Sequence, residues 1–97
     1  MQQDEQRLPK LDVRTGWIEL AIISEPFVVM TFKGYVPAVN VRVVRTGLEY
    51  MLYVSARSLA EALEPLRKAN SGRFRGLQFE IHKASDDKMA KYELRQC

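Results

Sequence analysis

The residue types that most often carry catalysis or bind metals are scarce in this sequence. His82 is the only histidine and Cys97 the only cysteine among the 97 residues, which is too few for a Cys/His cluster or a metal site of ordinary ligand count. We expect His82 to be an exposed residue on the polar face of a strand, with no nucleophile at a defined spacing from it. We therefore expect no enzyme, with no catalytic residue, no metal site and no cofactor.

Two further patterns offer oxygen or amide groups to an ion but have simpler explanations. The run Ser85-Asp86-Asp87 suggests a hard-cation site, yet such a run between two strands is typical of a turn. The glycines at positions 34, 47, 72 and 76 are isolated and match no phosphate-binding loop. Function must therefore be sought on the surface, in binding.

The 15 basic and 12 acidic residues are unevenly distributed. Between Glu25 and Glu49 the chain has three cations and no acid, and between Pro65 and Leu77 it has four cations and no acid. Acid-free basic stretches are typical of a surface that binds a polyanion, although solvated loops give the same pattern.

Aromatic side chains stand close to cations in several places, namely Lys33 with Tyr35, Arg42 with Tyr53, and Arg73 and Arg75 with Phe74. Single-stranded nucleic acid needs this combination, because cations bind its phosphates and flat side chains stack on its bases. The candidate nucleic-acid-binding residues are Lys33, Tyr35, Arg42, Met51, Tyr53, Arg73, Phe74, Arg75, Lys83, Lys88 and Lys91.

Several aromatic side chains also have a structural interpretation. We expect Phe32 and Tyr50 to lie in the core and Trp17 at its edge. Phe74, flanked by two arginines, is the best candidate for an exposed aromatic side chain. Tyr53 can face either way, because a shift of one residue in strand pairing moves a side chain to the opposite face of the sheet.

Alternation of apolar and polar side chains predicts that most of the chain is β-strand. Residues 17–32 show this pattern with an interruption at Ser24-Glu25-Pro26. Pro26 cannot donate a hydrogen bond within a sheet, so this segment is either one long strand bent at Pro26 or two strands in a hairpin.

Residues 36–55 predict a hairpin that turns at Thr46-Gly47, with one aliphatic face. The opposite face would carry Asn40, Arg42, Met51 and Tyr53. A capping box at Ser58 and an apolar stripe through Leu59, Leu63 and Leu66 then predict a short helix. We expect Pro65 to bend this helix or to end its regular part. Residues 77–83 and 89–95 predict a final pair of strands.

If the segment around Pro26 counts as one strand, this element order resembles the OB-fold, a small Greek-key barrel. The resemblance covers about Arg14 to Arg95 and includes no sequence motif. It implies a mainly β protein with one helix, a five-stranded β-β-β-α-β-β barrel whose first strand is long and bent near Pro26. It also implies that nucleic acid binds on the second and third strands and the loops beside them.

The resemblance to small single-stranded DNA-binding proteins implies binding of single-stranded DNA, with little sequence specificity and no catalysis. RNA stays open as the ligand. A homo-oligomer or a protein partner is also implied, because one small OB domain contacts only a few nucleotides. The alternative is a small protein–protein interaction module or an accessory subunit of a larger complex, since fold alone does not settle function.

The length of the chain supports one domain. We expect residues 1–13 to form a flexible tail and residues 14–97 a single OB-like domain. The first fifteen residues contain no apolar segment of a signal peptide, and no run reaches the roughly 18 apolar residues of a membrane span. We therefore expect a cytoplasmic or nucleoid-associated protein that does not bind membranes.

Overall fold

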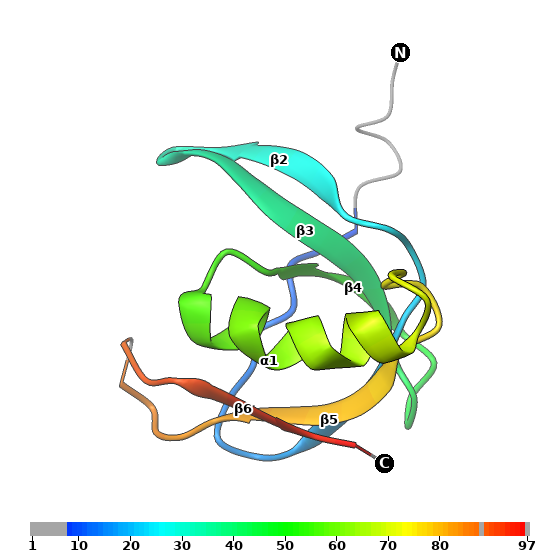
Figure 1. Ribbon diagram of the computed structural model, residues 1–97. Helices are drawn as coiled ribbons and strands as arrows, with labels where there is room; N and C mark the ends of the chain where they lie inside the picture. The colour runs from blue at the N-terminus through cyan, green and yellow to red at the C-terminus, as the bar shows by residue number, and fades with distance from the viewer. Residues whose placement is uncertain (1–7, 88, 97) are drawn as a thin grey trace.

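A computed structural model describes residues 8–87 and 89–96 of the chain (Figure 1). The elements in chain order are β1 (Ile18–Ile22), β2 (Phe27–Thr31), β3 (Gly34–Val43), β4 (Glu49–Tyr53), α1 (Arg57–Ala69), β5 (Gln78–Lys83) and β6 (Tyr92–Arg95). The protein is therefore mainly β with one helix, as expected. The six strands form one antiparallel sheet, and no pairing among the described residues joins β4 to β6, so the sheet is not closed into a barrel.

The strand β3 is the centre of this sheet. It pairs with β4 along one side, and on its other side it pairs first with β2 and then with β1. β1 and β2 therefore follow one another along the same edge of β3 and do not form a hairpin with each other. Of the two alternatives for this segment, the hairpin is wrong. The structure has two strands, β1 and β2, whose pairing with β3 is that of a single strand with an interruption.

The interruption between β1 and β2 is a bulge. Ile22 lies opposite Val41 and Phe27 lies opposite Ala38, so four residues of one strand span only two residues of β3. The N–H of Asn40 donates to Ser24 Oγ at 2.9 Å, and the N–H of Ile23 donates to the carbonyl oxygen of Asn40 at 2.9 Å. These bonds complete the ladder beside Pro26, and extra residues of this kind bend a strand.

The main core lies between the inner face of the sheet and α1, which crosses that face in Figure 1. Its centre consists of buried aliphatic residues from β1, β3, β5 and α1 together with Phe79. The β3–β4 register places Tyr50 opposite Val41 and Tyr53 opposite Ala38. Tyr50 therefore packs against the main core, and Tyr53 lies on the outer face of the sheet.

A second, smaller apolar cluster covers part of the outer face. Its buried residues are Val29, Ala38 and Met51, with Leu8, Phe27, Val36 and Tyr53 packed against them. The N-terminal segment lies beside β4, because the N–H of Met51 donates to Pro9 O at 2.7 Å and the N–H of Leu11 donates to Met51 O at 2.8 Å. Leu11 and Val13 are buried in the main core, so the domain boundary expected at residue 14 is too late. Residues 1–7 of the expected tail lie outside the described residues.

The helix differs from its prediction at its N-terminal end. α1 has Ala56 as its N-cap and no side-chain cap. The hydroxyl oxygen of Ser58 instead accepts a hydrogen bond from the N–H of Tyr92 at 3.1 Å, which joins the helix to β6. The predicted capping box is therefore wrong. Pro65 lies inside the helix, which continues to Ala69.

We predict that Leu63→Ala destabilises the protein by about 2–5 kcal/mol, because it removes a buried side chain and leaves a cavity. Leu63 is 1% exposed. The matched control is Leu48→Ala, since Leu48 lies in the β3–β4 turn and is 56% exposed. Urea unfolding measures both changes, and equal losses in the two variants would contradict this core.

Candidate functional site

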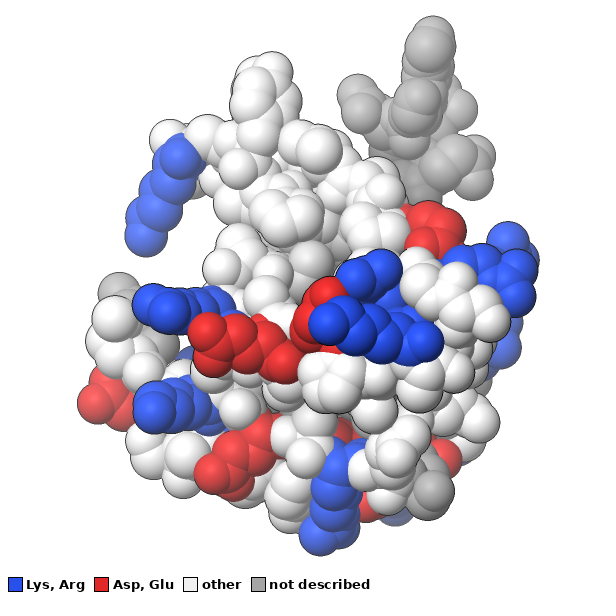
Figure 2. Space-filling model, viewed as in Figure 1, with Lys and Arg blue, Asp and Glu red and all other residues white. Residues whose placement is uncertain are grey.

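The most exposed apolar part of the protein is the hairpin of β2 and the first half of β3, residues 27–37, which we call the arm. It extends past the rest of the sheet at the upper left of Figure 1. Val28, Met30 and Tyr35 are 66%, 61% and 71% exposed, and Phe32 is fully exposed. Lys33 is the only charged residue of the arm, and this part of the surface is almost entirely white in Figure 2.

The tip of the arm is a two-residue turn. Thr31 pairs with Gly34, and the positive φ of Gly34, 106°, suits a residue without a side chain. The Thr31 hydroxyl donates to Gly34 O at 2.8 Å and accepts from the N–H of Lys33 at 3.1 Å. The turn thus places Phe32 and Lys33 outside the sheet, next to Tyr35. The expectation that Phe32 lies in the core is wrong, because the arm extends beyond the core.

The outer face of β3 and β4 carries the residues that the hairpin pattern predicted, but it is only partly available to a ligand. Met51 is 3% exposed and belongs to the second cluster, so it presents no surface for binding. Arg42 Nη2 lies 3.3 Å from Glu49 Oε2, an exposed ion pair of the kind that contributes about 0–1 kcal/mol. Tyr53 is half-buried, and Lys10 Nζ lies 4.8 Å from the centre of its ring.

The loop that follows α1 is held by one carboxylate. Glu25 Oε1 accepts from the N–H of Phe74 at 3.2 Å, and Glu25 Oε2 accepts from the N–H of Arg75 at 3.0 Å. These two backbone bonds, with a smaller effect from the charges of Arg73 and Arg75, lower the pKa of Glu25. Arg73 and Arg75 are exposed, whereas Phe74 packs partly against the main core. Phe74 is therefore not the exposed aromatic side chain that we expected.

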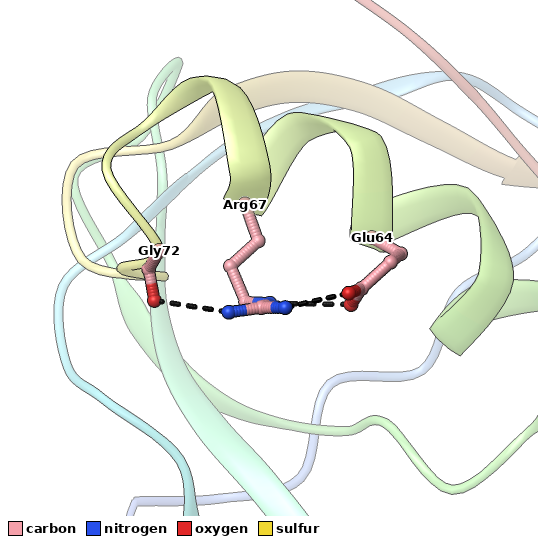
Figure 3. A network of polar contacts seen from close by, with 3 residues as sticks. All are labelled: Glu64, Arg67 and Gly72. Carbon is pink, nitrogen blue, oxygen red and sulfur yellow. Dashed lines mark hydrogen bonds and ion pairs between the residues drawn. The ribbon is translucent and has the colours of Figure 1, made fainter.

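The charged side chain of Arg67 binds neighbouring groups at the C-terminal end of α1 (Figure 3). Its Nη2 lies 2.5 Å from Glu64 Oε2, and its Nη1 donates to Gly72 O at 3.3 Å. The bonds with Glu64 raise the pKa of Arg67 and lower that of Glu64. Within the described residues, Lys68, Arg73 and Arg75 make no ion pair. Three of the four cations in this stretch thus stay available to an anion.

The lysines of the last hairpin differ in exposure. Lys83 is half-buried, with its Nζ 5.8 Å from the centre of the Tyr92 ring, and Lys91 is exposed. Lys91 lines a shallow groove between β6 and the first turn of α1, together with Arg57 and Glu61. Lys88 lies outside the described residues.

A cluster that we did not predict lies on the outer face of β1, β5 and β6. The Trp17 and His82 rings stack with their centres 3.9 Å apart, and the Arg95 guanidinium lies 4.0 Å from the centre of the Trp17 ring. His82 Nε2 lies 2.7 Å from Glu93 Oε1, and its Nδ1 lies 3.0 Å from the Thr15 carbonyl oxygen. The His82 side chain is only 16% exposed, so the expectation of an exposed histidine is wrong.

The contacts within this Trp17–His82 cluster have a structural explanation that involves no ligand. Both ring nitrogens of His82 already have partners, so neither is free for a ligand or a substrate. Nor do the described residues contain a group of three or more Cys, His, Asp or Glu side chains that could hold a metal ion. Only the pairing of β1 with β5 brings Trp17 to His82, and no local sequence signal announces that pairing.

The predicted binding residues therefore occupy separate places. Lys33 and Tyr35 meet at the tip of the arm, and Lys91 lies beside the first turn of α1. Arg73 and Arg75 follow the other end of the helix, on the right in Figure 1. Arg42 and Tyr53 share the outer face of the sheet. Two grooves that the described residues form beside α1 and β5 include only Lys91 and Lys83 of these residues.

We predict that Glu25→Gln lowers stability near neutral pH and that this loss disappears in acid. The folded pKa of Glu25 lies below its ordinary value of 4.5. Its stabilising effect is therefore fully present above that ordinary value and is lost as the pH falls through the folded pKa. Urea midpoints of the wild type and the variant should differ at about pH 7, and the difference should become smaller as the pH falls from about 4.5 towards 3.

The control for this prediction is Glu61→Gln, which removes a carboxylate that pairs with an exposed arginine, Arg57. It should change the midpoint little at either pH. A constant difference between wild type and Glu25→Gln at both pH values would contradict the assigned role of the Glu25 carboxylate.

Within the described residues, no helix is long and apolar enough to cross a membrane. Comparisons with protein-family models, with curated proteins and with solved structures give no match to this chain.

Proposed function

We propose that this protein binds single-stranded nucleic acid without catalysis. The observation that supports this most is the tip of the arm, where exposed Phe32 and Tyr35 stand beside Lys33. Aromatic side chains of this kind stack on bases, each base contributing about 1–3 kcal/mol, while a cation contacts the neighbouring phosphate. Such contacts carry little sequence specificity, because every base has a flat face.

The order of the strands also favours this proposal. With β1 and β2 taken as one interrupted strand, neighbouring strands follow the order of a five-stranded Greek-key barrel that is open between β4 and β6. OB-folds bind oligonucleotides on their second and third strands and on the loops before the second and fifth. On this comparison those parts are β3, β4, the tip of the arm, and the loop between β5 and β6. Both loops point to the left in Figure 1.

The cations that suit phosphates best are those without a carboxylate partner. Among the described residues these are Lys33 and Lys91 at the two loops, and Arg73 and Arg75 at the end of α1. Arg42 is a weaker candidate because Glu49 competes with a phosphate for its guanidinium. We therefore place the main contacts on the arm and the loop between β5 and β6.

We predict that a labelled oligo-dT binds this protein at about 50 mM salt and that affinity falls steeply as salt rises. Tyr35→Ala should weaken binding by about 5- to 150-fold, which corresponds to the loss of one stacked base. Lys33→Ala should flatten the slope of log K against log salt by about 0.7, the value for one phosphate of a single strand. Anisotropy titrations measure both effects.

Two substitutions at exposed sites in the β3–β4 turn, away from the arm and from the loop between β5 and β6, serve as matched controls. Leu48→Ala removes an exposed apolar side chain, and Arg45→Ala removes an exposed cation. Neither should change affinity. Parallel titrations with the matching RNA and with duplex DNA decide the type of nucleic acid. Absence of binding to all three ligands at low salt would reject the proposal.

A second function, docking to another protein through the arm, is favoured by a separate observation. The side chains of Val28 and Met30 are apolar, exposed and adjacent to Tyr35 and Pro37 on one face of the arm. Neighbouring apolar side chains left exposed together usually mark an interaction surface. Stacking on a base uses the ring of Tyr35, whereas docking uses Val28 and Met30, so substitutions separate the two functions.

A further inference from the structure

The outer edge of β2 carries backbone groups that have no partner among the described residues. The Thr31–Gly34 pair closes the hairpin, so residues 27, 29 and 31 bond to β3, and the N–H and C=O groups of Val28 and Met30 point away from it. Pro37 lies opposite Val28, and its carbonyl oxygen accepts from the N–H of Val54 at 3.0 Å, on the side of β4. Because the carbonyl group of Pro37 points to β4, Pro37 and Val28 do not bond to each other, and the backbone groups of Val28 point to the outer edge.

Within β2 itself this edge lacks the usual protection of an edge strand, since the bulge and Pro26 lie just before the strand. Proteins commonly place charges, proline or bulges on free edges to prevent pairing with other chains. β2 reads Phe-Val-Val-Met-Thr, without charge or proline, and the side chains of Val28 and Met30 are exposed beside the free backbone groups. The edge therefore offers both hydrogen bonds and apolar surface to an incoming strand.

We propose that β2 pairs antiparallel with β2 of a second copy of this chain, about a two-fold axis at Val29. This inference rests on the arm as a protein-docking surface and not on the binding of nucleic acid. In this register Val28 lies opposite the partner's Met30, and Met30 lies opposite the partner's Val28. Each of these pairs exchanges two hydrogen bonds, so all the outward groups of Val28 and Met30 are satisfied.

Pro26 disfavours the neighbouring register centred on Val28. Moving the axis to Val28 would place Met30 opposite the partner's Pro26, which has no N–H to donate. With the axis at Val29, the exposed side chains of Val28 and Met30 cover those of the partner on one face of the joined sheet. The contact is isologous, since the same patch serves both copies.

Opposite charges flank the ladder. Lys33 follows β2 and Glu25 precedes it, so antiparallel pairing brings Lys33 of one copy to the same end of the ladder as the partner's Glu25. Lys33 lies in the hairpin turn and Glu25 in the bulge, so neither belongs to the ladder itself. A second copy therefore matches the edge in hydrogen bonding and in apolar surface, with opposite charges at each end. The ladder is short, so we expect a dimer that dissociates on dilution.

Sedimentation velocity without nucleic acid, over about 1 μM to 1 mM protein, tests this proposal. The wild type should shift from the 11.2 kDa monomer to a dimer as its concentration rises. Val28→Lys places a charge on the edge, and Met30→Pro removes an outward N–H while leaving the bonds to β3 intact. Both variants should stay monomeric at every concentration, with the circular dichroism spectrum and urea midpoint showing that they are folded.

The matched control is Val44→Lys, because Val44 is an exposed valine outside the arm; this variant should dimerise as the wild type does. A wild type that stays monomeric to about 1 mM would overturn self-pairing alone. A dimer that persists in folded Val28→Lys and Met30→Pro would overturn pairing through β2, because another surface would then join the two copies. Oligonucleotide binding is measured separately, so its loss or retention does not affect either result.

Discussion

The backbone hydrogen bonds of β3 constrain every other part of the sheet. A strand of ten residues has polar groups on both sides, and each group that is buried must find a partner. β4 supplies partners on one side, and on the other side β1 and β2 must share the length. The bulge at residues 23–26 lets one continuous segment pair with both parts of β3 while it changes direction. As a result β1 pairs with β5, and β2 follows β3 past the core.

Local sequence patterns correctly predicted the features that depend on local backbone geometry, namely strand faces, turns and the position of the helix. The two faces of the hairpin at residues 36–55 are those that alternation indicated, because side chains of a strand must point to opposite sides. The interruption at Pro26 and the turn at Gly47, whose φ is 78°, were also expected. The helix was expected in the right place, although Ser58 does not cap it.

The rest depends on contacts between distant segments, which no short pattern reveals. Met51 was expected on a binding face, but residues 8–11 cover it. Phe74 packs against the main core, in a loop whose backbone is bonded to Glu25, far away in the sequence. Closure of the barrel would need β4 to meet β6, a pairing that element order cannot establish. The structure therefore differs from the sequence-based expectations more in the candidate site than in the fold, because the exposure of a side chain depends on contacts throughout the protein.

The hydrogen bond from Tyr92 to Ser58 has a consequence for local unfolding. The first turn of α1 has no side-chain cap, so the hydrogen bond to β6 adds to the contacts that Leu59 makes in the main core. When β6 separates from β5, the start of the helix loses a tertiary contact at the same moment. Hydrogen exchange in the first turn of α1 and in β6 should then follow one common opening event, although 34 residues separate Ser58 from Tyr92. The C-terminal strand and the start of the helix thus form one cooperative unit.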